Sequence, residues 1–240
     1  MWTYLQQFLV WIHGTGKVVI VFLSLAFAYS LMRRLRWSKQ STQVSGDARN
    51  RGHLPLDRLP LEAHELKAFD FGLGLGKIRN IVQGNVTDKE FVLFDSEVGH
   101  PHAEPTLQAI APFRVSGSAL PDFTLQPKSI LGDVLTRLGK SVDFGPDSDF
   151  SRDYFLTSHD ENRTRACFTP KFRDFFEGLE RFDPKKTWHL QKRGQWVVIY
   201  RKGEGTEPDD RQTFLEGAAE IVRNLEGRLV ETGAAWPPLH

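Results

Sequence analysis

The sequence predicts an α+β fold. A single N-terminal transmembrane helix is followed by one domain of mainly antiparallel sheet, with two or more hairpins covered by about four helices. Three observations support this prediction. The chain has 240 residues and 40% hydrophobic content, enough for one substantial core. Hairpin patterns are grouped with helical ones rather than alternating strictly with them. A run of fifteen uncharged, mostly apolar residues, Val18 to Met32, precedes that domain and ends at Arg33.

The first 37 residues are expected to form an amphipathic segment and a transmembrane anchor. Apolar residues recur at helical spacing over 2–12, which is typical of a helix lying in the membrane interface. As a helix, Val18 to Met32 covers roughly 22 Å of the ~30 Å hydrocarbon core, so a full span must recruit flanking residues. The side chains that we expect at the membrane interface are Lys17, Arg33, Arg34, Arg36 and Trp37.

The distribution of charge predicts which side of the membrane the domain occupies. Residues 1–60 carry eight Lys and Arg against two Asp and Glu, leaving 23 against 28 for the rest, or +6 followed by −5. Basic residues cluster after the apolar run, which favours a single-pass protein of the bacterial inner membrane with a cytoplasmic C-terminal domain. The expected partners are membrane lipid and a protein in the membrane. Nucleic acid is not expected, since its binders usually carry positive charge on the folded domain.

A secretory signal peptide is the alternative interpretation of the same segment. Ala26-Phe27-Ala28 resembles an A-x-A cleavage site. Against cleavage, a signal peptide usually has its positive charge in front, and the arginines after residue 32 oppose translocation.

Residues 38–60 are rich in Ser, Gln, Gly and Arg and include Pro55 and Pro60, a composition typical of a basic flexible linker. We assign the soluble α+β domain to residues 61–230 and a disordered tail to residues 231–240. The first hairpin is predicted from Ile81 to Val86, a Thr87-Asp88-Lys89 turn, and Phe91 to Phe94. Further strands are expected at 106–115 and 122–126, and a helix over 130–138, ended by Gly139.

The second half predicts three more helices and a second hairpin. Ser158 to Glu161 has the pattern of a capping box, so a helix should run toward Cys167. Pro170 restarts helical structure, with a stripe of Phe172, Phe175, Phe176 and Leu179 facing the core. Trp188 to Leu190, a turn at Arg193-Gly194, and Trp196 to Tyr200 predict a hairpin whose later strand lies mid-sheet. A last helix begins near Pro208.

The search for chemistry yields one weak metal candidate. His100 and His102, flanked by Glu97 and Glu104, could converge as ligands, although neighbouring prolines favour an exposed loop. The glycines at 72, 74 and 76 before Lys77 lack phosphate-loop spacing. The aspartates between 143 and 153 fail the calcium-loop pattern, so turn and cap roles are expected. Cys167 and His159 are too far apart along a helix for a nucleophile and base. We expect no cofactor.

Several stretches resemble a family of uncharacterised bacterial membrane proteins that carry an N-terminal hydrophobic segment before an α+β domain. The resemblance covers about two thirds of the chain and implies bacterial origin and membrane association, with no reaction attached. Ser96 stands where many members have an aromatic residue. The matching stretches are Arg79–Gly84, Val92–Asp95, Leu120–Pro127, Val142–Phe144, Phe150–Leu156, Phe168–Pro170 and Phe175–Glu177.

Location is therefore better defined than chemistry. We expect a membrane-anchored, non-enzymatic binding or accessory domain at the cytoplasmic face of a bacterial inner membrane. The alternative is a membrane-associated, metal-dependent hydrolase that uses His100 and His102.

Overall fold

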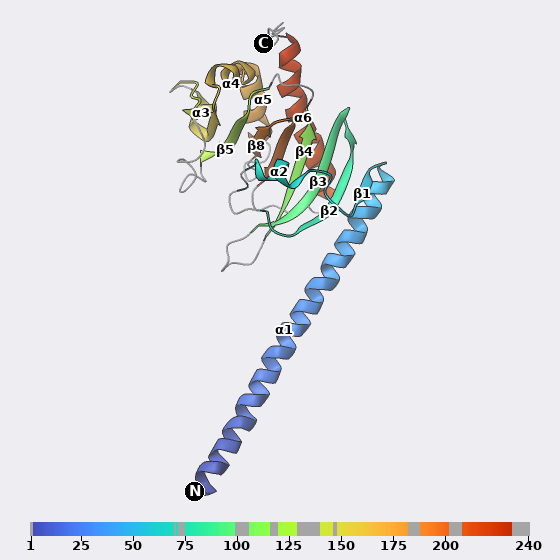
Figure 1. Cartoon of the computed structure of the whole chain (residues 1–240), viewed down its shortest axis with the longest axis vertical. Coiled ribbons are helices and arrows are strands. Elements are labelled where there is room, and N and C mark those ends of the chain that lie inside the picture. Colours follow the sequence, from blue (N-terminus) through green and yellow to red (C-terminus); the bar gives the residue numbers. More distant parts are fainter. Residues whose placement is uncertain are drawn as a thin grey trace. The chain divides into compact units, whose positions relative to one another are not determined.

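The computed structural model describes residues 2–69, 71, 75–98, 106–115, 120–128, 140–145, 148–181, 188–201 and 208–231. The chain divides into two compact units, Met1–Val44 and Ser45–His240. One long helix, α1 (Trp2–Asn50), makes up the first unit and continues into the second, where the described strands and the other helices lie (Figure 1).

The second unit is built on a nine-stranded sheet of described residues, in the order β1-β2-β3-β4-β9-β8-β5-β7-β6. All neighbouring pairs are antiparallel, which confirms the predicted sheet type. The strands are β1 (Leu54–Leu56), β2 (Ile78–Val86), β3 (Lys89–Val98), β4 (Thr106–Arg114), β5 (Phe123–Pro127), β6 (Lys140–Ser141), β7 (Tyr154–Ser158), β8 (Trp188–Arg193) and β9 (Trp196–Arg201).

Both predicted hairpins are confirmed. Thr87 and Asp88, with φ angles of 45° and 64°, join β2 to β3; two positive φ values are the signature of the tight turn that suits the twist of paired strands. The turn between β8 and β9 uses Gly194 at a φ of 54°. The strand β9 lies between β4 and β8, mid-sheet as its continuous apolar sequence predicted.

Four helices cover one face of the sheet: α3 (Asp149–Asp153), α4 (Glu161–Cys167), α5 (Pro170–Arg181) and α6 (Pro208–Glu231). The helices α3 and α4 pack beside β7, and Figure 1 shows α6 running beside β4. The helix α5 buries Phe172 and Phe176 completely, as its stripe predicted. Gly217 in α6 allows Trp188 to pack closely, since an added Cβ would lie 3.2 Å from that ring.

The opposite face is covered in part by the segment that contains α2 (Ala63–Lys67). Leu61, Phe69 and Phe71 pack in one cluster with side chains of β3, β4 and β9. The indole nitrogen of Trp196 donates to Glu65 Oε1 at 2.9 Å, so a hydrogen bond also ties α2 to the sheet. This hydrogen bond helps to lower the pKa of Glu65, after the larger effect of the Glu62 backbone amide.

A buried ion pair joins α6 to the sheet. Both carboxylate oxygens of Asp95 accept from Arg211 Nη1, at 2.8 and 2.9 Å, and the two side chains are 1% and 6% exposed. Asn80 Nδ2 donates to the same carboxylate at 2.7 Å. Asn80 has a φ of 51° at a register shift in β2, and its carbonyl accepts from Arg211 Nη2. The bulge thus places both the carbonyl and the side chain of Asn80 in hydrogen-bond contact with the buried Asp95–Arg211 pair.

Four sequence predictions differ from the structure or lie beyond it. Residues 38–50 belong to α1 and 54–56 form β1, where the composition predicted a flexible linker. The cap of α4 is Asp160, which accepts from Arg163 N at 3.0 Å, whereas Ser158 ends β7. The predicted helix over 130–138 and the tail from residue 232 onward lie outside the described residues.

Candidate functional site

The described part of α1 exposes a band of apolar side chains. Phe22, Leu23 and Phe27 are between 64% and 71% exposed. Successive residues on a helix point about 100° apart, so an unbroken apolar run surrounds the helix rather than lining one face. Exposed apolar surface of this kind marks a contact with protein or membrane. Its described members are Val19, Val21, Phe22, Leu23, Leu25, Phe27, Tyr29, Leu31, Met32 and Leu35.

Within the part of the chain whose side chains are described, no helix carries an apolar stretch long enough for a membrane span. The side chains predicted at the membrane interface, Lys17, Arg33, Arg34, Arg36 and Trp37, are not among those described. That assignment stays a prediction.

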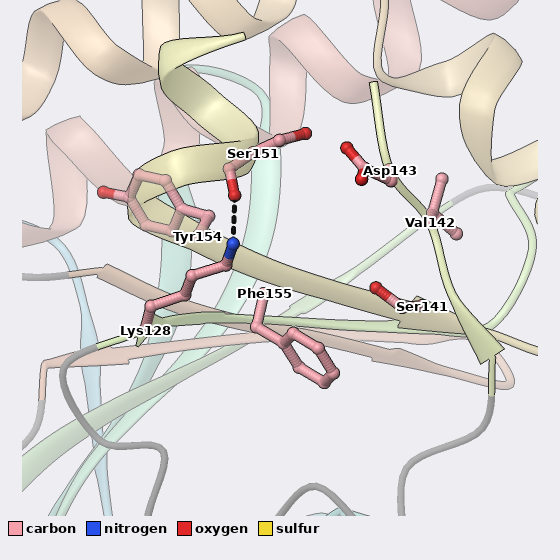
Figure 2. A pocket seen from close by; sticks show the side chains of 7 residues that line it. All are labelled: Lys128, Ser141, Val142, Asp143, Ser151, Tyr154 and Phe155. Carbon is pink, nitrogen blue, oxygen red and sulfur yellow. Dashed lines mark hydrogen bonds between the residues drawn. The ribbon is translucent and has the colours of Figure 1, made fainter. Parts of the chain in front are cut away.

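A pocket of about 290 Å³ opens in the second unit, where β5, β6, β7 and α3 meet. Figure 2 shows Lys128 and Phe155 on one side and Ser141, Val142 and Asp143 on the other. Ser151 and Tyr154 complete the lining. The pocket brings together residues from three separate stretches of the chain, 128, 141–143 and 151–155.

The pocket holds one cation and one anion. The Lys128 ammonium donates to the carbonyl of Ser151, which occupies one of its three donors. Asp143 Oδ1 accepts from Gly145 N at 3.0 Å. That backbone hydrogen bond, followed by one with Ser151, holds the pKa of Asp143 below its ordinary value. Asp143 is therefore a carboxylate at neutral pH and faces a pocket that contains an ammonium group.

Hydrogen bonds and cation–π contacts hold the segment 142–144, which forms one edge of the pocket. Val142 N donates to Leu156 O at 2.8 Å, and Ser151 Oγ accepts from Phe144 N at 2.9 Å. The guanidinium groups of Arg173 and Arg165 lie 4.2 and 5.3 Å from the centre of the Phe144 ring, within the range of cation–π attraction. The loop that carries Asp143 is thus held from both ends.

Of the four residues that the sequence offered as metal ligands, the structure describes only Glu97. His100, His102 and Glu104 lie outside the described residues, whereas Glu97 pairs with Arg79 at 2.8 Å. Among the residues that the structure describes, no three His, Cys, Asp or Glu side chains are grouped to hold a metal ion. Gly76 approaches the backbone of Glu97 so closely that a Cβ would lie 2.4 Å from its carbonyl oxygen, while Gly72 and Gly74 are not described.

Cys167 is buried, and desolvation raises the pKa of its thiol to about 11. A protonated, inaccessible thiol is unreactive, in line with our rejection of a nucleophile. Sequence reasoning missed Lys128, Ser141 and Phe155. No local motif marks them, because the pocket exists only once β5, β6 and β7 pair.

No protein-family model matches the chain, and no characterised protein matches it in sequence. In fold, the chain is similar to the crystal structure of the mycobacterial trehalose monomycolate transport factor A, TtfA. The TM-score is 0.50 at 11% sequence identity, and the match covers 84% of this chain and 98% of that one. At this identity the likeness shows a shared α+β fold.

Proposed function

We propose that this protein is a membrane-attached, non-enzymatic accessory factor in lipid transport, with its folded domain at the cytoplasmic face of a bacterial inner membrane. The observation that carries the proposal is the apolar band of α1, which gives a chain with a TtfA-like fold the means to attach to lipid. Burying that band in a bilayer would remove from water apolar surface that the described fold leaves exposed.

The lipid part of the proposal rests on the fold. TtfA is named for the transport of trehalose monomycolate, a sugar esterified with a long-chain acid. Almost the whole of that crystallised chain matches this one, so the correspondence involves its complete fold rather than a shared motif. We therefore infer a related role, with a glycolipid as the transported class.

The non-enzymatic part rests on the tasks of the reactive side chains. Asp95 is paired with Arg211, and Asp160 caps α4. Cys167 is buried and protonated. Each of these groups has a structural role that occupies it, which favours binding over catalysis.

Membrane attachment is tested with the double variant Leu23→Lys/Leu25→Lys, which places two charges in the apolar band, each costing about 2.5–3.5 kcal/mol near a bilayer centre. The matched control is Gln43→Lys, at an exposed position of the same helix. We expect the wild type and the control to float with vesicles of phosphatidylcholine and phosphatidylglycerol, and the double variant to stay at the bottom of the gradient. Equal flotation of all three would reject α1 as the attachment.

The transport role and orientation are tested in the source bacterium. Deletion of the gene should make a glycolipid accumulate in the inner membrane, measured by radiolabelling and thin-layer chromatography. The wild type and Gln43→Lys should reverse this, and Leu23→Lys/Leu25→Lys should not. A fluorescent protein fused after residue 240 should be bright. Alkaline phosphatase activity from the same position would instead place the domain outside the cytoplasm.

A further inference from the structure

The pocket between β5, β6 and β7 combines chemical features that a ligand must match together. Lys128 and Asp143 contribute opposite charges that cancel. The Lys128 ammonium has three donors, and its bond to the Ser151 carbonyl uses one of them. After the larger effect of a backbone hydrogen bond, its charge also helps to lower the pKa of Asp143. Ser141 adds an exposed hydroxyl, and Phe155 adds a half-buried aromatic ring.

The charge balance selects against simple ions. An anion held by Lys128 would meet the carboxylate of Asp143, and a cation held by Asp143 would meet the ammonium. A neutral ligand rich in hydroxyl groups suits both, since one hydroxyl can donate to the carboxylate while another accepts from the ammonium. The lowered pKa of Asp143 keeps that acceptor ionised at neutral pH.

Size and shape narrow the ligand further. At about 290 Å³ the pocket lies just below the ~300–1,000 Å³ typical of small-molecule sites. This is too small for a long acyl chain and suits a single sugar unit. The half-buried Phe155 ring offers apolar surface on which the C–H face of such a ring can pack (Figure 2).

We propose that this pocket binds a neutral sugar, with hydroxyl groups bonded to Lys128, Asp143 and Ser141 and the ring packed against Phe155. The inference rests on the proposed function in one respect, because it takes the sugar to be the headgroup of the transported glycolipid. A free sugar has the same chemistry, and the experiment separates the two sources.

The experiment measures saturation-transfer NMR from the full chain in phosphatidylcholine and phosphatidylglycerol vesicles to dissolved trehalose, a disaccharide of which one glucose unit would enter the pocket. Ser141→Phe fills the pocket from an exposed edge-strand position without removing a structural hydrogen bond. Asp143→Asn keeps the shape of the side chain and removes its charge. Asp174→Asn, an exposed position on α5, is the matched control. O-phosphoethanolamine serves as a zwitterionic comparison that also matches one cation and one anion.

Trehalose signal is expected from the wild type and from Asp174→Asn, absent in Ser141→Phe, and about tenfold weaker in affinity in Asp143→Asn, the effect of losing a charged hydrogen bond. Adding monoglucosyldiacylglycerol to the vesicles separates the sources: a reduced trehalose signal supports the lipid headgroup, and an unchanged one supports a free sugar. The inference is overturned if Ser141→Phe retains the signal or if no sugar signal appears with the wild type. It is also overturned if O-phosphoethanolamine displaces trehalose from the wild type and its own binding is weakened by Ser141→Phe and Asp143→Asn.

Flotation of the same samples keeps this result distinct from the proposed function. A chain that floats but binds no sugar removes only the pocket assignment. A chain that does not float contradicts membrane attachment, whatever the pocket binds.

Discussion

Two helices of this molecule use the same apolar residue types in opposite ways. In α6, Phe214, Val222 and Leu225 are almost completely buried against the sheet. In α1, Phe22, Leu23 and Leu25 are all more than 60% exposed. The difference lies in the pattern. The helix α6 interleaves apolar residues with charged ones such as Glu216 and Arg223, so one of its faces is polar and exposed to solvent. In α1, no charged residue interrupts the apolar run between Val18 and Met32.

The comparison teaches that periodicity, rather than apolar content, separates a helix that completes a soluble core from one that needs another environment. Substitutions that treat the two helices alike should therefore have unequal effects on folding. The predictions below test this inequality.

The largest effect is expected at the polar contact of α6. Arg211→Met should destabilise the folded domain by about 3–5 kcal/mol, because the Asp95 carboxylate stays buried without its partner. Chemical denaturation followed by tryptophan fluorescence measures this loss. Arg223→Met, on the exposed side of α6, is the control and should change stability by less than about 0.5 kcal/mol. Similar losses in both variants would mean that burial does not determine how much each ion pair contributes to the free energy of unfolding.

The next effect concerns the apolar side of α6. Leu225→Ala should cost about 2–5 kcal/mol of unfolding free energy, since it removes three buried carbon atoms and leaves a cavity at a fully buried site. The same denaturation curves measure it. A loss below about 1 kcal/mol would show that α6 adjusts its packing freely and would weaken its contrast with α1.

The matched substitution in α1 should have almost no effect on folding. Leu25→Ala changes a side chain that is 62% exposed, so the unfolding free energy should move by less than about 0.5 kcal/mol. A loss comparable to that of Leu225→Ala would show that this part of α1 packs on protein, which would break the comparison.

A small, pH-dependent effect is expected where α1 ends. The His53 ring meets Phe91 edge-on at 5.1 Å, and desolvation, followed by the charge of Arg51, lowers the pKa of His53 from 6.5. The folded state thus favours the neutral ring. The unfolded chain binds protons first as pH falls below 6.5, so this contribution is fully present above pH 6.5 and is lost below it.

Denaturation at pH 7.5 and pH 5.5 measures this loss. His53→Gln, which cannot titrate, should show a smaller difference between the two conditions than the wild type. If the unfolding free energy of His53→Gln changes between the two pH values as much as that of the wild type, groups other than His53 cause the pH dependence.

The elements that the sequence predicted correctly are those whose pattern lies within one short segment of the chain. The turn at Thr87-Asp88 and the stripe of α5 were visible because alternation and 3.6-residue spacing act within one segment. The linker prediction was wrong over 38–50, because polar composition alone does not exclude a helix that continues from an apolar one. Ser158 was given a cap role that belongs to Asp160, two residues later, since both residue types suit that position.

The pocket and the buried ion pair could not be predicted in this way. Asp95 and Arg211 are more than a hundred positions apart, and neither has a neighbour that marks it as buried and charged. The pocket similarly depends on the pairing of β5 with β7 and of β7 with β6. Such sites arise from topology, and one sequence does not reveal which strands become adjacent.

The strand order has a consequence for how the protein is made. The hairpin β8–β9 joins β4 on one side to β5 on the other, so the centre of the sheet is synthesised after both flanks. Until residue 201 has left the ribosome, the nascent chain presents two half-sheets whose inner edges are unpaired, a state prone to misassociation. We expect a chain truncated at residue 187 to depend on chaperones and to aggregate without them, although it contains seven of the nine described strands.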